Sequence, residues 1–242
     1  MKSILITGAS SGIGRATAEL FLNEGWCVGV LARRGELLEE LAAQYDTAVP
    51  LEADITQADQ VGAAFDRFLG SAGRLDVLFN NAGIFTPPGT IDEIPLDHWH
   101  NAVAVNLTGM FLAARCAFAA MRAQNPQGGR IINNGSISAH VPRPGSITYT
   151  ATKHAVTGLT RTLSLDGRPF DIACGQIDIG NAETPMVAEL KQRAIADGGE
   201  VPETMAVDDA ARSVLHMANL PLSANVQFMT VMATKMPYIG RG

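Results

Sequence analysis

A tyrosine and a lysine four positions apart, Tyr149 and Lys153, are the residues whose types and spacing point most directly to chemistry. Residues four apart on a helix share one face, so the phenol and the ammonium are expected side by side. A neighbouring positive charge favours phenolate and lowers the tyrosine pKa, which suits Tyr149 to proton exchange near neutral pH. Taken alone the pair is common, and the alternative is a coincidence on a helix surface.

Two polar residues from other stretches are candidates for the same centre. Ser136 follows an apolar strand expected at Arg130–Asn134, and the helix with Tyr149 begins after the next loop. Asn106 is a polar residue in the middle of an apolar helix expected from Asp97 to Gln124. On its own, Asn106 is better explained as a hydrogen-bonded amide of the core.

A glycine-rich turn near the N-terminus indicates a bound phosphate. Its strand, Ser3–Thr7, leads into a helix through Gly8, Ser10, Ser11, Gly12, Ile13 and Gly14. Gly8 permits a tight turn, Gly12 lets the backbone approach a pyrophosphate, and Gly14 lets helix and strand pack closely. Backbone N–H groups at such a helix N-terminus face an anion. The spacing is Gly-x-x-x-Gly-x-Gly, and the alternative is an ordinary structural turn.

The residues after the second expected strand, Trp26–Leu31, distinguish two dinucleotides. An acidic residue there would bind the ribose 2′-hydroxyl of NAD, but the sequence has Ala32, Arg33 and Arg34. An arginine accommodates the 2′-phosphate of NADP in a bidentate fork. The sequence therefore favours NADP(H), with NAD(H) as the alternative cofactor. The competing interpretation is that both arginines are solvated residues before the helix Glu36–Gln44.

Further cofactor contacts are expected where the next two strands end. Asp54 and Ile55 follow the strand Thr47–Glu52, and Asp54 either accepts from an adenine amino group or caps the turn into the next helix. Asn81, Ala82 and Gly83 follow the strand Leu75–Phe79. Asn tolerates left-handed backbone and Gly allows close approach, so this turn is expected to line the cofactor crevice.

The elements that carry these residues alternate strand and helix along all 242 residues, which predicts one α/β domain over 1–242. The net charge of −6 without a basic cluster argues against nucleic acid and anionic membranes as partners. No apolar run approaches the ~20 residues of a membrane span. Three scattered cysteines fit free thiols in a reducing, cytoplasmic setting better than a disulfide or metal framework, and no metal site is expected.

Together these residues resemble the short-chain dehydrogenase/reductase family. The resemblance rests on Thr-Gly-x-x-x-Gly-Ile-Gly at 7–14, Asp54, Asn-Asn-Ala-Gly at 80–83, Asn106, and the Ser136–Tyr149–Lys153 set. It implies a doubly wound Rossmann fold of about seven parallel strands ordered 3-2-1-4-5-6-7, with helices on both faces. It also implies a homodimer or homotetramer.

The resemblance further implies roles for these residues. Tyr149 would exchange a proton with the substrate oxygen during hydride transfer, and Ser136 would hydrogen-bond that oxygen. Lys153 would bind the nicotinamide ribose and lower the Tyr149 pKa, while Asn106 would hold a water in a relay to Lys153. Gly180 and Thr184 align with family residues that approach the nicotinamide, and a segment at about 184–203 would cover the substrate.

The chain departs from the family after the sixth strand, expected at Asp171–Asp178. Ile179 stands where the family usually has proline, and Asp178 replaces a small apolar residue. Asp178 either points at a substrate hydroxyl or amine, or accepts N–H bonds from the Gly180–Thr184 turn, which is the favoured interpretation. With Ser138 and His140 it forms a candidate substrate set. His140 and Arg143 could contact a polar substrate, but solvated loop residues are the favoured interpretation for these two.

Three functions follow from this pattern. The leading one is an NADP(H)-dependent enzyme that interconverts a carbonyl compound and a secondary alcohol. The second is a catalytically silent NADP(H)-binding sensor or scaffold, against which the complete set of Asn106, Ser136, Tyr149 and Lys153 argues. The third is an isomerase or dehydratase that uses its cofactor transiently.

Overall fold

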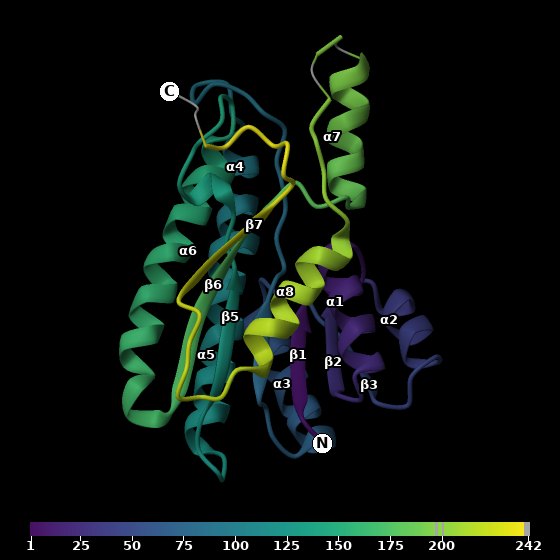
Figure 1. Ribbon diagram of the computed structural model, residues 1–242, viewed down its shortest axis with the longest axis vertical. Helices are drawn as coiled ribbons and strands as arrows, with labels where there is room; N and C mark the ends of the chain where they lie inside the picture. Colours follow the sequence, from purple (N-terminus) through teal and green to yellow (C-terminus); the bar gives the residue numbers. More distant parts are fainter. Residues whose placement is uncertain (197, 200, 240–242) are drawn as a thin grey trace.

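The apolar stretches expected as strands pair into one parallel seven-stranded sheet in the computed structural model (Figure 1). Its order is β3-β2-β1-β4-β5-β6-β7, as predicted. The structure describes residues 1–196, 198–199 and 201–239, without the side chains of 186, 190 and 193; Asp197 and Glu200 of the expected covering segment and the last three residues lie outside it. The strands are β1 Ser3–Thr7, β2 Cys27–Ala32, β3 Ala48–Glu52, β4 Val77–Asn80, β5 Gly129–Asn134, β6 Ile172–Gly180 and β7 Phe228–Met232.

Helices cover both faces of the sheet because each central strand is apolar on both sides. Ile4 and Ile6 of β1 face one apolar cluster, formed with α1, α2 and α8, while Leu5 faces a second cluster, formed with α3 and α5. The helices are α1 Gly12–Asn23, α2 Gly35–Ala42, α3 Ala58–Ala72, α4 Leu96–Val103, α5 Met110–Ala123, α6 Ile147–Asp166, α7 Pro185–Ala196 and α8 Val207–Asn219.

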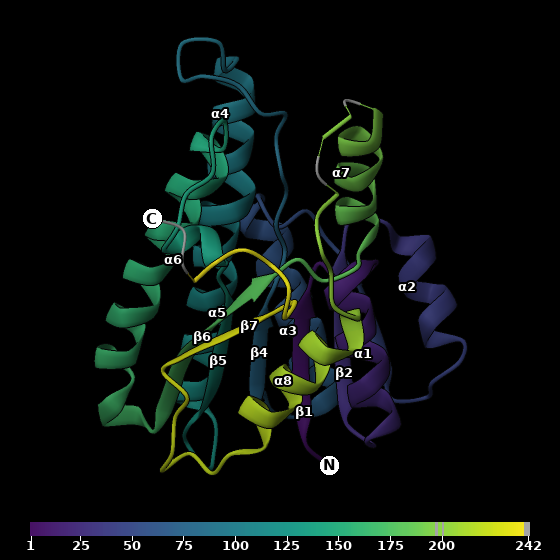
Figure 2. The same ribbon diagram turned by 45° about the horizontal axis from the view of Figure 1, so that its top comes forward.

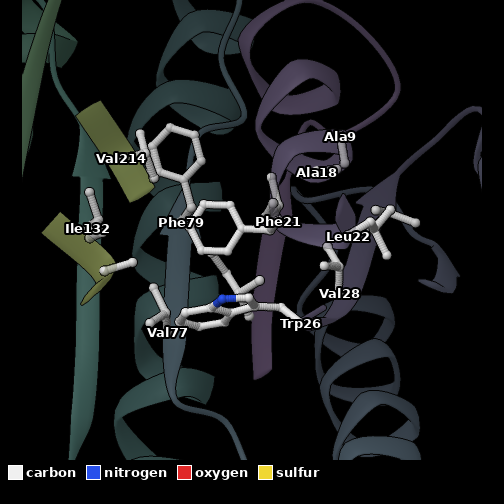
Figure 3. Packing of buried hydrophobic residues seen from close by; sticks show 14 of the residues in the cluster. Ala9, Ala18, Phe21, Leu22, Trp26, Val28, Val77, Phe79, Ile132 and Val214 are labelled. Atoms are coloured by element: carbon white, nitrogen blue, oxygen red, sulfur yellow. The ribbon is translucent and has the colours of Figure 1, made fainter. Parts of the chain in front are cut away.

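Aromatic packing fixes α1 and α8 against the sheet (Figure 3). The rings of Phe21 on α1 and Trp26 lie edge to face with centroids 4.9 Å apart. Phe79 of β4 and Val214 of α8 complete this part of the cluster, and all four side chains are buried. Because α1 begins at the glycine-rich turn, this packing holds the helix N-terminus at the carboxyl edge of the sheet.

The long helix expected from Asp97 to Gln124 is interrupted. A π-helical segment at Ala104–Gly109 separates α4 from α5 and contains the fully buried Asn106. Such segments are often found at functional sites. By length and composition, the continuous run Leu96–Ala123 is the one stretch of the described chain apolar enough to cross a membrane. Its buried residues pack into the core with α3 and the sheet, which explains its apolar character.

The sixth strand is longer than predicted. It continues through Gly180, and Asp178 and Gly180 pair with Thr230 and Met232 of β7. Proline lacks the N–H that a strand ladder needs, whereas Ile179 retains it, so the ladder continues past the position where the family usually turns. Asp178 therefore lies inside β6, whereas the strand was expected to end at this residue.

Two segments rise above the carboxyl edge of the sheet. Figure 2 shows α7 on one side and the loop between β4 and α4 on the other. The chain leaves β6 at Asn181, and residues after α7 return beside it, with Glu183 N–H donating to the Met205 carbonyl at 2.9 Å. Lys191 of α7 is paired with Glu183. These contacts tie the base of α7 to the end of β6.

Candidate active site

A cavity of about 380 Å³ lies at the carboxyl edge of the sheet, where the order of the strands reverses between β1 and β4. It is lined by every residue expected to bind cofactor except Gly14, and by Ser136, Tyr149 and Lys153. The residues it brings together are Gly8, Ser10, Ser11, Gly12, Ile13, Arg33, Arg34, Asp54, Ile55, Asn81, Ala82, Gly83, Ser136, Tyr149, Lys153, Gly180 and Thr184.

The glycine-rich turn has the geometry of a phosphate cradle. Gly8 has a φ of +69°, in the left-handed region that favours glycine. A side chain at Gly14 would overlap the Gly8 carbonyl, which explains why Gly14 serves packing without lining the cavity. Ser11 makes no side-chain cap on α1, and the first turn of α1 has no acidic residue. The N–H groups at the start of α1 are therefore suited to an anionic group such as a pyrophosphate.

Arg34 closes one side of this turn. Its Nη2 donates to Ser10 Oγ at 2.8 Å and to Ser11 Oγ at 2.9 Å. Arg33 is exposed and lines the same cavity. A guanidinium held beside two serine hydroxyls forms a donor-rich corner at the end of β2, which suits a phosphate ester.

Side-chain hydrogen bonds join the ends of β1, β4 and β5. Thr7 Oγ1 accepts from the N–H groups of Asn81 and Ala82, each at 2.9 Å. The Asn81 amide donates to the Thr7 carbonyl and accepts from Asn134, also at 2.9 Å in both cases. The Asn-Ala-Gly turn is thereby fixed against the glycine-rich turn.

Asp54 accepts hydrogen bonds within its own turn, as expected if it caps the turn into the next helix. Its Oδ1 accepts from the Thr56 N–H at 2.9 Å and from the Thr56 hydroxyl at 2.8 Å. Asp54 also lines the cavity, and its Oδ2 accepts no hydrogen bond from the described residues. The carboxylate can therefore serve the turn with one oxygen and an amino group in the cavity with the other.

Tyr149, Ser136 and Lys153 meet as their spacing predicts. The Ser136 side chain acts on Tyr149 by lowering its pKa, and Ser136 Oγ accepts from the Ser138 N–H at 3.1 Å. Lys153 Nζ lies 5.5 Å from the centroid of the Tyr149 ring and donates to the Asn134 carbonyl at 2.7 Å. A phenol beside a hydroxyl and an ammonium can hold a substrate oxygen and exchange a proton with it.

The ionisation of this centre differs from the expected pattern. Burial raises the Tyr149 pKa above its ordinary value; the Ser136 side chain and the charge of Arg143 lower this pKa in part, and Asp178 adds to the rise. Burial lowers the Lys153 pKa to about 8. The expected net lowering of the tyrosine pKa by Lys153 is therefore outweighed by desolvation, and Tyr149 is held as a phenol able to donate a proton.

Asn106 is fixed by the loop after β4. Its Oδ1 accepts from the Ile84 N–H at 2.7 Å, and its Nδ2 donates to the Ile84 carbonyl at 2.9 Å. A Cβ placed on Gly83 would lie 3.4 Å from Asn106 Oδ1 and 3.8 Å from Lys153 Nζ. Both polar groups thus border the same small space, although Asn106 does not line the main cavity.

The candidate substrate set lies behind the cavity wall. Ser138 and Asp178 are fully buried, and neither they nor His140 line the cavity. Asp178 Oδ1 accepts from the Ser136 N–H at 2.8 Å, and its Oδ2 is 2.8 Å from His140 Nε2. Within the described residues, its hydrogen bonds include none from the Gly180–Thr184 turn, so that favoured interpretation is wrong.

Three residues of the site were missed by motif reasoning. Phe85 stacks on Tyr149 with ring centroids 4.1 Å apart. Gln176 donates to Asp178 Oδ1 at 2.7 Å. The Asn134 carbonyl holds Lys153. For Gln176, a polar residue inside an apolar strand and two positions before Asp178 was the available signal, because residues two apart share a strand face. Phe85 and a backbone carbonyl carry no comparable signal.

Comparisons with known proteins agree with this geometry. The family model described as short chain dehydrogenase matches residues 2–194. The chain is 36% identical over 205 residues to trans-4-hydroxycyclohexanecarboxylate dehydrogenase of Sinomonas cyclohexanicum, covering 79% of this chain and 76% of that protein. It is 30% identical over 241 residues to sulfoacetaldehyde reductase 2 of Chromohalobacter salexigens, covering 97% and 95%.

A solved structure extends the agreement to three dimensions. The crystal structure of 3-ketoacyl-(acyl-carrier-protein) reductase from Brucella melitensis, complexed with NADH, superposes with a TM-score of 0.85 at 28% identity, covering 96% of each chain. The fold and site residues thus fit a nicotinamide dinucleotide cofactor and oxidoreductase chemistry. The chain belongs to the short-chain dehydrogenase/reductase family of NAD(P)-dependent oxidoreductases.

Proposed function

We propose that this protein interconverts a carbonyl compound and a secondary alcohol with NADP(H). The observation that carries the proposal is one cavity that joins the phosphate cradle at Gly8–Gly12 to the Tyr149 phenol. In this assignment Tyr149, Ser136, Lys153 and Asn106 form the catalytic set. The NADPH-dependent reduction of a panel of ketones and aldehydes, followed at 340 nm, tests it.

The proposed cofactor site extends from the cradle to Tyr149. The start of α1 takes the pyrophosphate, and Arg33 and Arg34 share the 2′-phosphate, with Arg34 held in place by Ser10 and Ser11. Asp54 and Ile55 flank the adenine, and Asn81–Gly83 line the ribose side. Gly180 and Thr184 approach the nicotinamide, as Thr184 lies against Gly12 across the cavity.

In the proposed reaction the cofactor supplies or accepts the hydride. In the direction of reduction, Tyr149 donates its phenolic proton to the carbonyl oxygen, and Ser136 donates a hydrogen bond to that oxygen. The raised Tyr149 pKa is consistent with this role, because it keeps the phenol protonated at neutral and mildly alkaline pH, as a proton donor must be. Lys153 holds the nicotinamide ribose, and the space that it shares with Asn106 at Gly83 is where a relay water would return a proton.

Two observations support an anionic substrate within this class. Arg143 lines the cavity, its charge acts on Tyr149, and among the described residues its guanidinium has no ion pair. The relatives named above act on a carboxylate and on sulfoacetaldehyde. Arg143 would hold the carboxylate or sulfonate while the carbonyl faces Tyr149. The segment 184–203 with α7 would cover this end, since Pro185 and Val187 line the cavity.

We propose that the protein is a homodimer or homotetramer and that it acts in the cytoplasm. Free thiols at Cys27, Cys116 and Cys174 suit a reducing compartment, and Trp99 and Phe111 leave apolar surface on α4 and α5 for a second copy. The competing silent NADP(H)-binding protein would bind NADPH tightly and oxidise it with no member of the panel. An isomerase or dehydratase would convert substrate without net loss of NADPH.

A further inference from the structure

Asp178 is a buried carboxylate at the centre of a hydrogen-bond cluster. Only 1% of its side chain is exposed. Its Oδ1 accepts from the Ser136 N–H at 2.8 Å and from Gln176 Nε2 at 2.7 Å, and its Oδ2 is 2.8 Å from His140 Nε2. A buried carboxylate is strongly destabilising unless such donors compensate it. The cluster is therefore an organised arrangement around the charge.

The cluster links two neighbouring strands behind the active site. Asp178 belongs to β6, because the ladder continues past Ile179, and Ser136 follows the end of β5. Gly135 makes the approach possible, since a side chain there would overlap Asp178 Oδ1 and the Gln176 amide. The carboxylate consequently reaches the backbone of the serine whose side chain lowers the Tyr149 pKa.

We propose that Asp178 is a positioning residue for Ser136, acting through the serine N–H, with Gln176 and His140 holding the carboxylate in place. The proposal rests on the proposed reduction at Tyr149 and explains the two departures from the family pattern together. Ile179 extends the strand that places Asp178, and Asp178 supplies an anchor for the Ser136 backbone from the extended strand. Asp178 does not line the cavity. In this proposal it does not contact the substrate.

The charge of Asp178 gives this role a signature that packing alone does not have. The carboxylate raises the pKa of both Tyr149 and Lys153, whereas Arg143 lowers that of Tyr149. His140 contacts the carboxylate itself, with its side chain 38% exposed. Removing the Asp178 charge should therefore lower the Tyr149 and Lys153 pKa values together, so in reduction the alkaline limb of the kcat/KM profile moves to lower pH.

Two substitutions separate hydrogen bonding from charge. Asp178→Ala removes both and should lower kcat by about 10- to 100-fold, as expected for a misplaced catalytic group. Asp178→Asn keeps acceptors for Ser136 and Gln176 and offers an amide to His140, so it should retain most of kcat but show the shifted alkaline limb. NADPH affinity is measured at pH 6, where Lys153 stays protonated, and should change little in either variant.

The matched control is Arg130→Gln at the opposite end of β5. Arg130 is 1% exposed and donates to Asn225 and to the carbonyls of Leu220, Pro221 and Ala224. Loss of the Arg130 guanidinium should lower the melting temperature, while kcat per NADPH-binding site should equal that of the wild type. Gln176→Leu removes one donor from Asp178 Oδ1 and should give a smaller loss of kcat than Asp178→Ala.

Two results would overturn the proposal. One is an Asp178→Ala enzyme with wild-type kcat per NADPH-binding site. The other is an Asp178→Asn enzyme with an unshifted alkaline limb. If the wild-type chain reduces no carbonyl compound, the proposed function fails, but the ¹H–¹⁵N resonance of Ser136 still tests the anchor. Its amide proton should move upfield in Asp178→Ala and stay in place in Arg130→Gln; an unmoved resonance would refute the Asp178 contact.

Discussion

Lys153 Nζ lies 5.5 Å from the centroid of the Tyr149 ring while it donates to the Asn134 carbonyl at 2.7 Å. The ammonium is thereby held at the tyrosine in a site where only 3% of the lysine is exposed. Burial explains why its pKa falls to about 8. Burial places Lys153 where it can contact a ribose and the Tyr149 phenol. The same burial desolvates the ammonium, so its charge lowers the free energy of unfolding at neutral pH.

This relationship predicts how stability depends on pH. The Lys153 pKa is about 8 in the folded chain against 10.5 for an unperturbed lysine. Between these values the folded state binds fewer protons than the unfolded state, so the free energy of unfolding rises with pH. The melting temperature of wild type minus that of Lys153→Met should therefore increase between pH 7 and pH 10, measured by calorimetry. A constant or falling difference would show that the ammonium is not penalised by burial.

Cofactor choice is predicted to depend on both arginines after β2. Arg34→Ala should weaken NADPH binding by about tenfold or more, as for loss of a charge-assisted hydrogen bond, and leave NADH binding nearly unchanged. Arg33→Ala should act in the same direction. Ala32→Asp with Arg33→Ile should move kcat/KM toward NADH, because it replaces a phosphate clamp with a ribose-hydroxyl acceptor. A wild-type enzyme that prefers NADH would contradict this assignment.

The anionic substrate class is tested at Arg143. Arg143→Gln should lower kcat/KM for keto acids by about 10- to 100-fold and leave their methyl esters nearly unaffected, since only the former lose a charge partner. Arg168→Gln is the control, because it makes the same change of net charge at an exposed position in the short 3₁₀ helix Arg168–Phe170 before β6. Equal losses for acid and ester, or none for either, would remove Arg143 from substrate recognition.

The resemblance to the family implied the sheet order, which the structure confirms. The residues themselves predicted a shared cofactor site, because glycine turns that follow apolar parallel strands lie at one edge of a sheet, and the cavity lies there. Sequence reasoning missed the π-helical segment at Ala104–Gly109, since the pattern of apolar residues there also fits a regular helix. The segment nevertheless places Asn106 against Ile84.

The role of Asp178 shows where a one-dimensional pattern fails. Both sequence interpretations assumed that the strand ends at Asp178, but Ile179 keeps the N–H that proline lacks and the strand runs on to Gly180. Two of the three partners of Asp178, Ser136 and His140, are about 40 positions away, a distance over which spacing carries no information. The Tyr149 pKa was likewise mispredicted because burial is a property of the folded chain.

The central claim is that Tyr149 is the acid/base for reduction by NADPH. The most direct measurement compares wild type with Tyr149→Phe, which keeps the ring packed on Phe85 and removes only the hydroxyl. NADPH affinity should be unchanged, and kcat for a ketone that the wild type reduces should fall by about 10²-fold or more, as for loss of a general acid. A Tyr149→Phe enzyme that turns over near the wild-type rate would contradict the account.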